Sequence, residues 1–179
     1  MKNQTSNIRD RTSIGGFSLI EVLIATILIG LSIAALVGAN GSFSLANATG
    51  ADLSTAEFLA EQIRELTTML PVVDPAVPAG TFVTVLGPEG GETLATYDDV
   101  DDFNGATYSP PVASNRAVLN DLAGFGQHIV VQKLDSSNFA QTCLDSSILA
   151  SANRFVRVTV TILQNGRQII SASWIRARY

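Results

Sequence analysis

The chain has 179 residues and is 46% hydrophobic but only 15% charged, with a mean hydropathy of +0.28. An average soluble domain has about 25% charged residues, so a disordered, charge-rich chain is excluded and an ordinary soluble enzyme is disfavoured. The net charge of −5 argues against a nucleic-acid-binding surface, which needs a basic face. A single cysteine and a single histidine exclude an internal disulfide, a cysteine-based zinc site and a multi-histidine metal site.

The apolar excess lies in one segment near the start of the chain. Residues 17–39 contain one charged residue, Glu21, and as a helix they span about 35 Å, which is enough to cross a bilayer core. Residues 1–16 are polar and carry three basic residues against one acid. By the positive-inside tendency we expect this end in the cytoplasm and residues 40–179 across the membrane.

A secretory signal peptide has a similar order of basic and apolar residues, but three details disagree with it. The apolar run is longer than the 7–15 residues of a signal-peptide core, it lacks an A-x-A-like site, and it contains Glu21. A charge inside a span costs at least ~2.5 kcal/mol, which makes Glu21 a candidate functional residue. The alternative is that its carboxylate extends to water at the interface.

The residues around Glu21 favour a functional role for it over a carboxylate that merely extends to water. Residues 15–22 read GGFSLIEV, after a short basic leader and before a long apolar helix. This order resembles the processing site of type IV prepilins and of the pseudopilins of type II secretion. The resemblance implies that a prepilin peptidase cuts after Gly16 and that Phe17 becomes the N-methylated N-terminus. It also implies that Glu21 pairs with the amine of a neighbouring subunit.

Cleavage after Gly16 would change the charge as well as the length. The leader holds Lys2, Arg9, Arg11 and Asp10, so its removal takes the formal net charge from −5 to −7. The chain also loses the basic anchor that sets its orientation, which is consistent with later extraction from the bilayer into a fibre.

A second helical segment follows residues 17–39. Residues 40–50 are small and polar with several glycines nearby, each costing about 1 kcal/mol in a helix, so we expect a possible interruption there. Leu59, Ile63, Leu66 and Leu70 then recur at helical spacing as an apolar stripe, and prolines from Pro71 onward stop the helix. We therefore predict one long helix from about 17 to 70, whose second half is residues 40–70.

Residues 71–179 are predicted to form a strand-rich head. Strand-like runs occur at 81–86 and 127–134, and residues 154–176 alternate apolar and polar around Asn165–Gly166, a preferred hairpin turn. We predict an antiparallel sheet packed on the second half of the long helix, an α+β fold. The resemblance implies that this is the type IV pilin fold.

Three further patterns extend the resemblance into the head. Residues 97–105 read YDDVDDFNG, residues 122–125 read LAGF before a strand, and residues 157–161 read RVTVT. Together they look like minor pilins of the mannose-sensitive haemagglutinin type, the MshD and PilV-like group. The segment 136–151, which contains Cys143, matches no pattern and is interpreted as a variable loop.

The acidic segment 98–104 is the candidate for chemistry in the head. Asp99, Asp101 and Asn104, followed by Gly105 at a sharp turn, offer hard oxygen ligands for Ca²⁺, although the spacing is not that of an EF-hand. The alternative is a solvated acidic turn. Beyond this candidate metal site no cofactor is expected.

Charge is unevenly distributed along the head. Residues 52–102 hold eleven acids and one base, Arg64, whereas residues 154–179 hold five arginines and no acid. Two interpretations stay open: complementary charges within the domain, or head-to-tail contacts between neighbouring subunits.

No set of acid, base and nucleophile suggests an enzyme. His128 lies in a strand-like run without partners, and Cys143 has no nearby histidine, so both are expected to be structural. The predicted function is that of a structural minor pilin. Its expected partners are other pilin subunits, the prepilin peptidase, the inner-membrane assembly platform and, before assembly, membrane lipid; no nucleic acid is expected. The expected location is a single pass through the inner membrane with a periplasmic head, then a fibre.

Two alternatives remain. One is a minor pseudopilin of a type II secretion system. The other, of a different class, is a binding module at a pilus tip, such as an adhesin or uptake receptor.

Overall fold

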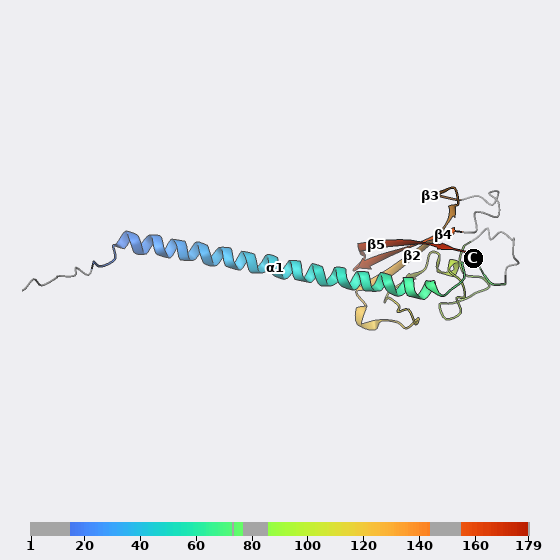
Figure 1. Ribbon diagram of the computed structural model, residues 1–179. Helices are drawn as coiled ribbons and strands as arrows, with labels where there is room; N and C mark the ends of the chain where they lie inside the picture. Colours follow the sequence, from blue (N-terminus) through green and yellow to red (C-terminus); the bar gives the residue numbers. More distant parts are fainter. Residues whose placement is uncertain (1–14, 73, 77–85, 144–154, 179) are drawn as a thin grey trace, which may run out of the picture. The chain divides into compact units, whose positions relative to one another are not determined.

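The computed structural model describes residues 15–72, 74–76, 86–143 and 155–178 (Figure 1). The chain divides into two compact units at Asn47–Ala48, and each is described here by itself. The first unit contains the start of helix α1 (Leu19–Thr68), and the second contains the rest of α1 and all strands. The second unit has an α+β arrangement of one helix on an antiparallel sheet, as the sequence predicts.

Helix α1 begins where Ser18 can cap it. The Ser18 hydroxyl accepts a hydrogen bond from the Glu21 amide at 3.3 Å, which satisfies one of the free amides of the first turn. The predicted interruption at 40–50 does not occur: α1 is helical through these residues, Gly41 and Gly50 included. A long helix surrounded by good helix formers tolerates a cost of about 1 kcal/mol per glycine. It ends at Thr68, close to the predicted position and just before Pro71.

The sheet has the order β1–β2–β4–β5, with β3 paired to the far end of β2, and every pairing is antiparallel. The strands are β1 (Thr107–Tyr108), β2 (Phe125–Asp135), β3 (Asn138–Thr142), β4 (Phe155–Gln164) and β5 (Arg167–Ala177). Two short 3₁₀ helices, η1 (Asp101–Phe103) and η2 (Asn120–Leu122), lie in the connection between α1 and β2.

Two of the predicted strand regions are confirmed, whereas β3 lies in the segment 136–151 that the sequence analysis interpreted as a loop. The run 127–134 lies within β2, and the 154–176 unit is the β4–β5 hairpin. Its turn residues have positive φ, 50° at Asn165 and 79° at Gly166, as the predicted hairpin turn requires. The predicted strand at 81–86 falls almost entirely outside the described residues.

The core forms between the helix stripe and one face of the sheet. Leu59, Ile63 and Leu66 are buried as predicted, and Leu70 packs against the core half-buried. On the facing strand β4 the alternate residues are buried, and Thr159 and the other intervening residues are half-exposed. The buried members of β4 are Val156, Val158, Val160 and Ile162. The two sequence periodicities therefore meet in a single apolar layer.

A buried glutamine joins three parts of the head. The Gln127 side chain on β2 donates to the Leu59 carbonyl of α1 and to the Val112 carbonyl, both at 3.0 Å, and accepts from the Val112 amide at 2.8 Å. Leu59, Val112 and Gln127 are all buried, so water does not reach the side-chain amide. Both of its polar atoms are instead hydrogen-bonded within the protein.

The C-terminal arginines stabilise the head through carbonyl groups. Arg176 donates to the carbonyl of Thr67, in the last turn of α1, at 2.8 Å and to the carbonyl of Leu70, just after the helix, at 3.0 Å. Carbonyls at a helix C-terminus lack their regular intrahelical partners, and Arg176 supplements the bond that the Thr67 carbonyl accepts from the Leu70 amide at 3.3 Å. The one ion pair between described side chains joins Arg64 to Glu61 within α1, so direct pairing of the acidic and basic segments is not seen in the described part of the chain.

Candidate functional site

The residues of the predicted processing site precede and begin α1. Gly15 and Gly16 lie before the helix in extended or irregular backbone, and Phe17 is 81% exposed. Glu21 is the third residue of α1, in its first turn, where a negative charge is favoured by the helix dipole. Among the described residues, the Glu21 carboxylate forms no ion pair.

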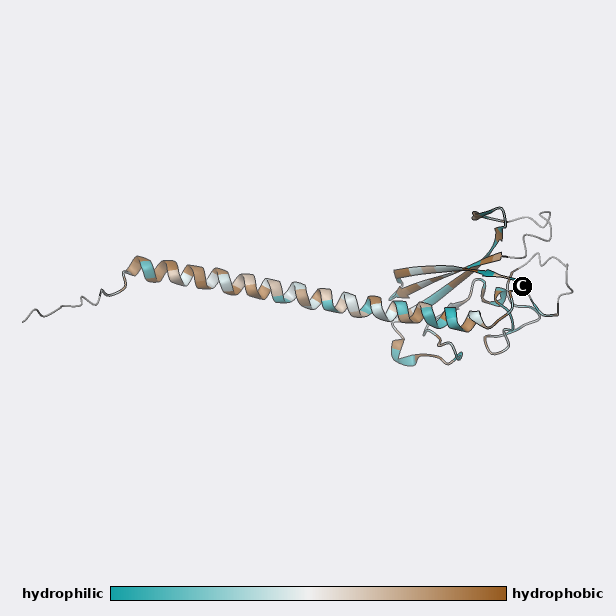
Figure 2. Cartoon of the chain, viewed as in Figure 1, coloured by the Kyte–Doolittle hydropathy of each residue, from teal (hydrophilic) through white to brown (hydrophobic). Residues whose placement is uncertain are grey.

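The first part of α1 is apolar on every side. All fifteen large apolar side chains from Phe17 to Leu45 are exposed, and consecutive residues such as Val22, Leu23 and Ile24 point in different directions around the axis. Figure 2 shows the brown, hydrophobic colouring along this part of α1 and the mixed colouring nearer its C-terminal end. A helix that is apolar all round needs a cover of lipid or other protein.

The polar groups within this apolar run are internally satisfied. The hydroxyls of Thr26 and Ser32 donate to carbonyls one turn earlier, at 2.9 and 2.8 Å. α1 is a single helix that is both long enough and apolar enough to cross a membrane. Glu21 is therefore the group in residues 17–39 that most needs a partner outside the helix.

The second candidate site is the acidic segment of the head. Asp99, Asp101 and Asp102 are almost completely buried, with exposures of 0%, 1% and 0%. One oxygen of Asp99 accepts the amides of Asp101 and Asp102, and one oxygen of Asp102 accepts the amides of Asp98 and Asp99. Through these hydrogen bonds, the Asp99 and Asp102 carboxylates stabilise the backbone of their own loop, which includes η1.

The predicted calcium ligands are only partly brought together. Asp99 and Asp101 belong to the buried group, but the Asn104 amide is engaged elsewhere. Its Oδ1 accepts the Val131 amide at 3.0 Å and its Nδ2 donates to the Leu86 carbonyl at 3.4 Å. Asn104 therefore fastens the loop to β2.

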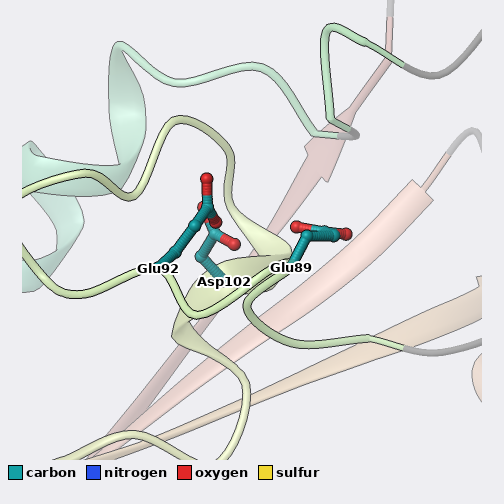
Figure 3. A group of neighbouring side chains, drawn as sticks. All are labelled: Glu89, Glu92 and Asp102. Atoms are coloured by element: carbon teal, nitrogen blue, oxygen red, sulfur yellow. The ribbon is translucent and has the colours of Figure 1, made fainter.

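Two glutamates that the sequence reasoning missed join the acidic group. Oxygens of Glu89, Glu92 and Asp102 lie within 4.8 Å of one another (Figure 3). Oxygens of Asp98, Asp99 and Asp102 also lie within 4.8 Å of one another. The signal in the sequence was the run GPEGGE at 87–92, in which two adjacent glycines with positive φ turn both glutamates toward η1.

Burial and mutual repulsion shift the titration of these acids. Desolvation, and then the neighbouring Asp99, raises the pKa of Asp101 to about 9. A hydrogen bond between the Glu92 carboxyl and the adjacent Asp102 carboxylate, and then desolvation, raises the pKa of Glu92 to about 7. Without a cation, the Asp101 carboxyl therefore retains its proton at neutral pH.

His128 lies in strand β2, and Cys143 directly follows strand β3. His128 Nδ1 lies 3.0 Å from the Thr107 hydroxyl, across the β1–β2 pair. Cys143 is a free, half-buried thiol whose pKa is raised by burial, which disfavours the nucleophilic thiolate.

Comparison with known proteins adds no relative. No known protein family, curated protein or solved structure matches this chain. The assignment of function therefore rests on the residues themselves.

Proposed function

We propose that this chain is a structural subunit of a type IV pilus-like fibre, a minor pilin with the type IV pilin fold that assembles through the first half of α1. The observation that carries the proposal is the combination of the GGFSLIEV motif at 15–22 with an apolar helix exposed on all sides directly after it. A membrane anchor alone explains the helix. It does not explain a carboxylate at Glu21 that has no partner among the described residues.

Processing follows from the chemistry at the start of the helix. A prepilin peptidase cuts after Gly16, where the missing side chain lets the protease approach the backbone closely. The new amine of Phe17 becomes methylated and keeps its positive charge. Because Gly16 and Phe17 precede the first turn of α1, the bond can be cut without unwinding the helix.

Assembly then replaces lipid by neighbouring helices. Packing the large apolar side chains of residues 17–39 against other subunits keeps them out of water. Glu21 pairs with the Phe17 amine of a neighbouring subunit, since an unpaired charge in this apolar environment costs at least ~2.5 kcal/mol. The pair favours one axial register, because a shift by one turn leaves both charges unpaired.

In this proposal, the head lies on the periplasmic side of the inner membrane and later on the surface of the fibre. The subunit is extracted from the bilayer by an inner-membrane assembly platform. The net charge of −5 supports a role in protein assembly over direct contact with nucleic acid.

The assembly step is tested by Glu21→Val in cells that make the fibre. The variant should be cleaved normally, since the peptidase acts on the other side of Phe17, but its amount in sheared fibres should fall at least tenfold. Glu57→Val is the matched control, because Glu57 is an exposed acid of the same helix far from residues 17–39. Normal incorporation of Glu21→Val would overturn the pairing role.

A further inference from the structure

The acidic group of the head lacks the partners that buried carboxylates require. Asp99 Oδ2, Asp102 Oδ1, Glu92 Oε2 and both oxygens of Asp101 are buried without a hydrogen-bond partner. Buried charged groups are normally paired or coordinate a metal. Among the described residues, no lysine or arginine forms an ion pair with any of them. Lys133 is the cation whose field reaches Asp101.

The free oxygens belong to side chains that are already held in place. Asp102 uses Oδ2 to bind the amides of Asp98 and Asp99, so its Oδ1 is fixed and unpartnered. The Asp102 carboxylate lies beside Glu89 and Glu92 of the preceding loop, with one oxygen of each residue within 4.8 Å of the other two (Figure 3). A fully buried carboxylate that has one unpartnered oxygen and lies beside two further carboxylates is a preformed position for a cation.

The geometry suits calcium. Two oxygens that bind one Ca²⁺ ion at about 2.3–2.6 Å lie up to about 5 Å apart, and the three carboxylates lie within 4.8 Å of one another. Ca²⁺ takes oxygen ligands in flexible geometry, and the half-buried Glu89 and Glu92 leave room for solvent to complete the shell. Neither of the two residues that favour zinc, His128 or Cys143, belongs to the group.

We propose that Glu89, Glu92 and Asp102 form a calcium-binding site, and that the bound ion fastens the loop of residues 86–92 to η1. The site does not depend on the proposed pilin function, because all of its ligands lie in the second unit of the chain. This set contains none of the ligands of the sequence-based hypothesis, Asp99, Asp101 and Asn104; Asp102 and two glutamates from the preceding loop take their place.

A thermal-shift measurement on the full chain in detergent micelles tests the site. The chain's one tryptophan, Trp174, packs 5.4 Å from the Arg64 guanidinium in the head and reports its unfolding. At about 10 mM Ca²⁺ and an affinity typical of extracellular modules, the Tm should rise by about 5 °C over a chelator-treated sample. Mg²⁺ at the same concentration should raise it by less than half as much.

Two variants decide which carboxylates bind the ion. Glu92→Gln should abolish the Ca²⁺ response while its Tm in chelator stays equal to or above that of the wild type, because a repulsive charge is removed. Asp98→Asn is the matched control: Asp98 is exposed and belongs only to the neighbouring trio, so its Ca²⁺ response should persist. Glu89→Gln repeats the test should Glu92→Gln fail to fold.

Several results would overturn the proposal. An unchanged Tm of the wild type in Ca²⁺, or an equal effect of Mg²⁺, would exclude a built calcium site. Persistence of the response in both Glu92→Gln and Glu89→Gln, or its loss in Asp98→Asn, would exclude the assigned ligands.

Discussion

Gln127→Met should be among the most destabilising single changes in the head that conserve side-chain volume. Methionine fills the same space but cannot donate, and its sulfur is a weak acceptor. The amide and the carbonyl of Val112 then lose the partners that hold them at 2.8 and 3.0 Å in the core. The Leu59 carbonyl keeps its intrahelical bond and loses less. Each of these two buried backbone groups costs about 1–3 kcal/mol when it lacks a hydrogen-bond partner. Together they predict a fall in the free energy of unfolding of about 3 kcal/mol.

The loss is measured by thermal or urea unfolding of the full chain in detergent, followed by Trp174 fluorescence. For a head of this size about 3 kcal/mol corresponds to a fall in Tm of roughly 10 °C. Gln168→Met on the exposed edge of β5 is the control and should change Tm by less than about 2 °C. Equal, small effects of both variants would refute the reasoning that Gln127 ties α1 and the Val112 loop to β2.

Three further outcomes are expected in the head. Arg176→Met removes two charge-assisted bonds at the end of α1 and should cost about 2 kcal/mol in urea unfolding; an equal effect of Arg178→Met would argue against this capping role. Gly166→Ala places a side chain at φ 79° in the β4–β5 turn and should cost about 1 kcal/mol, so an unchanged unfolding midpoint would contradict the turn geometry. With chelator present, Tm should fall as pH rises from about 5 to 9, because the raised pKa values of Asp101 and Glu92 make the folded state bind more protons than the unfolded state. Asp101→Asn should flatten this dependence, and a Tm that rises with pH in the wild type would contradict the direction of the shifts.

The elements that the sequence predicts best are those with a regular hydrophobic periodicity or a strong turn signal. The β4–β5 hairpin follows from strict alternation around Asn165–Gly166, and the buried stripe of α1 follows from the spacing of Leu59, Ile63 and Leu66. Local glycine content misled at residues 40–50, since the cost of each glycine is small compared with the cooperativity of a long helix.

The contacts that sequence could not predict are those between distant segments. Gln127 reads as an ordinary polar residue at the start of a strand run, and only the packed structure gives it Leu59 and Val112 as partners. The acidic group was located from its aspartates, but Glu89 and Glu92 reach it through a turn whose path depends on glycines with positive φ. The spacing of residues along the sequence does not show that these two segments meet in the folded head.

The measurement that tests the central claim most directly is the mass and N-terminal residue of the chain from cells with an active prepilin peptidase. The account predicts loss of residues 1–16, Phe17 at the N-terminus, and one added methyl group. Gly16→Val should block the cut, whereas Gly15→Val, one residue earlier, should permit it. A chain that keeps residues 1–16, or that is cut after residue 39 as a secreted protein would be, would contradict the assignment as a pilin.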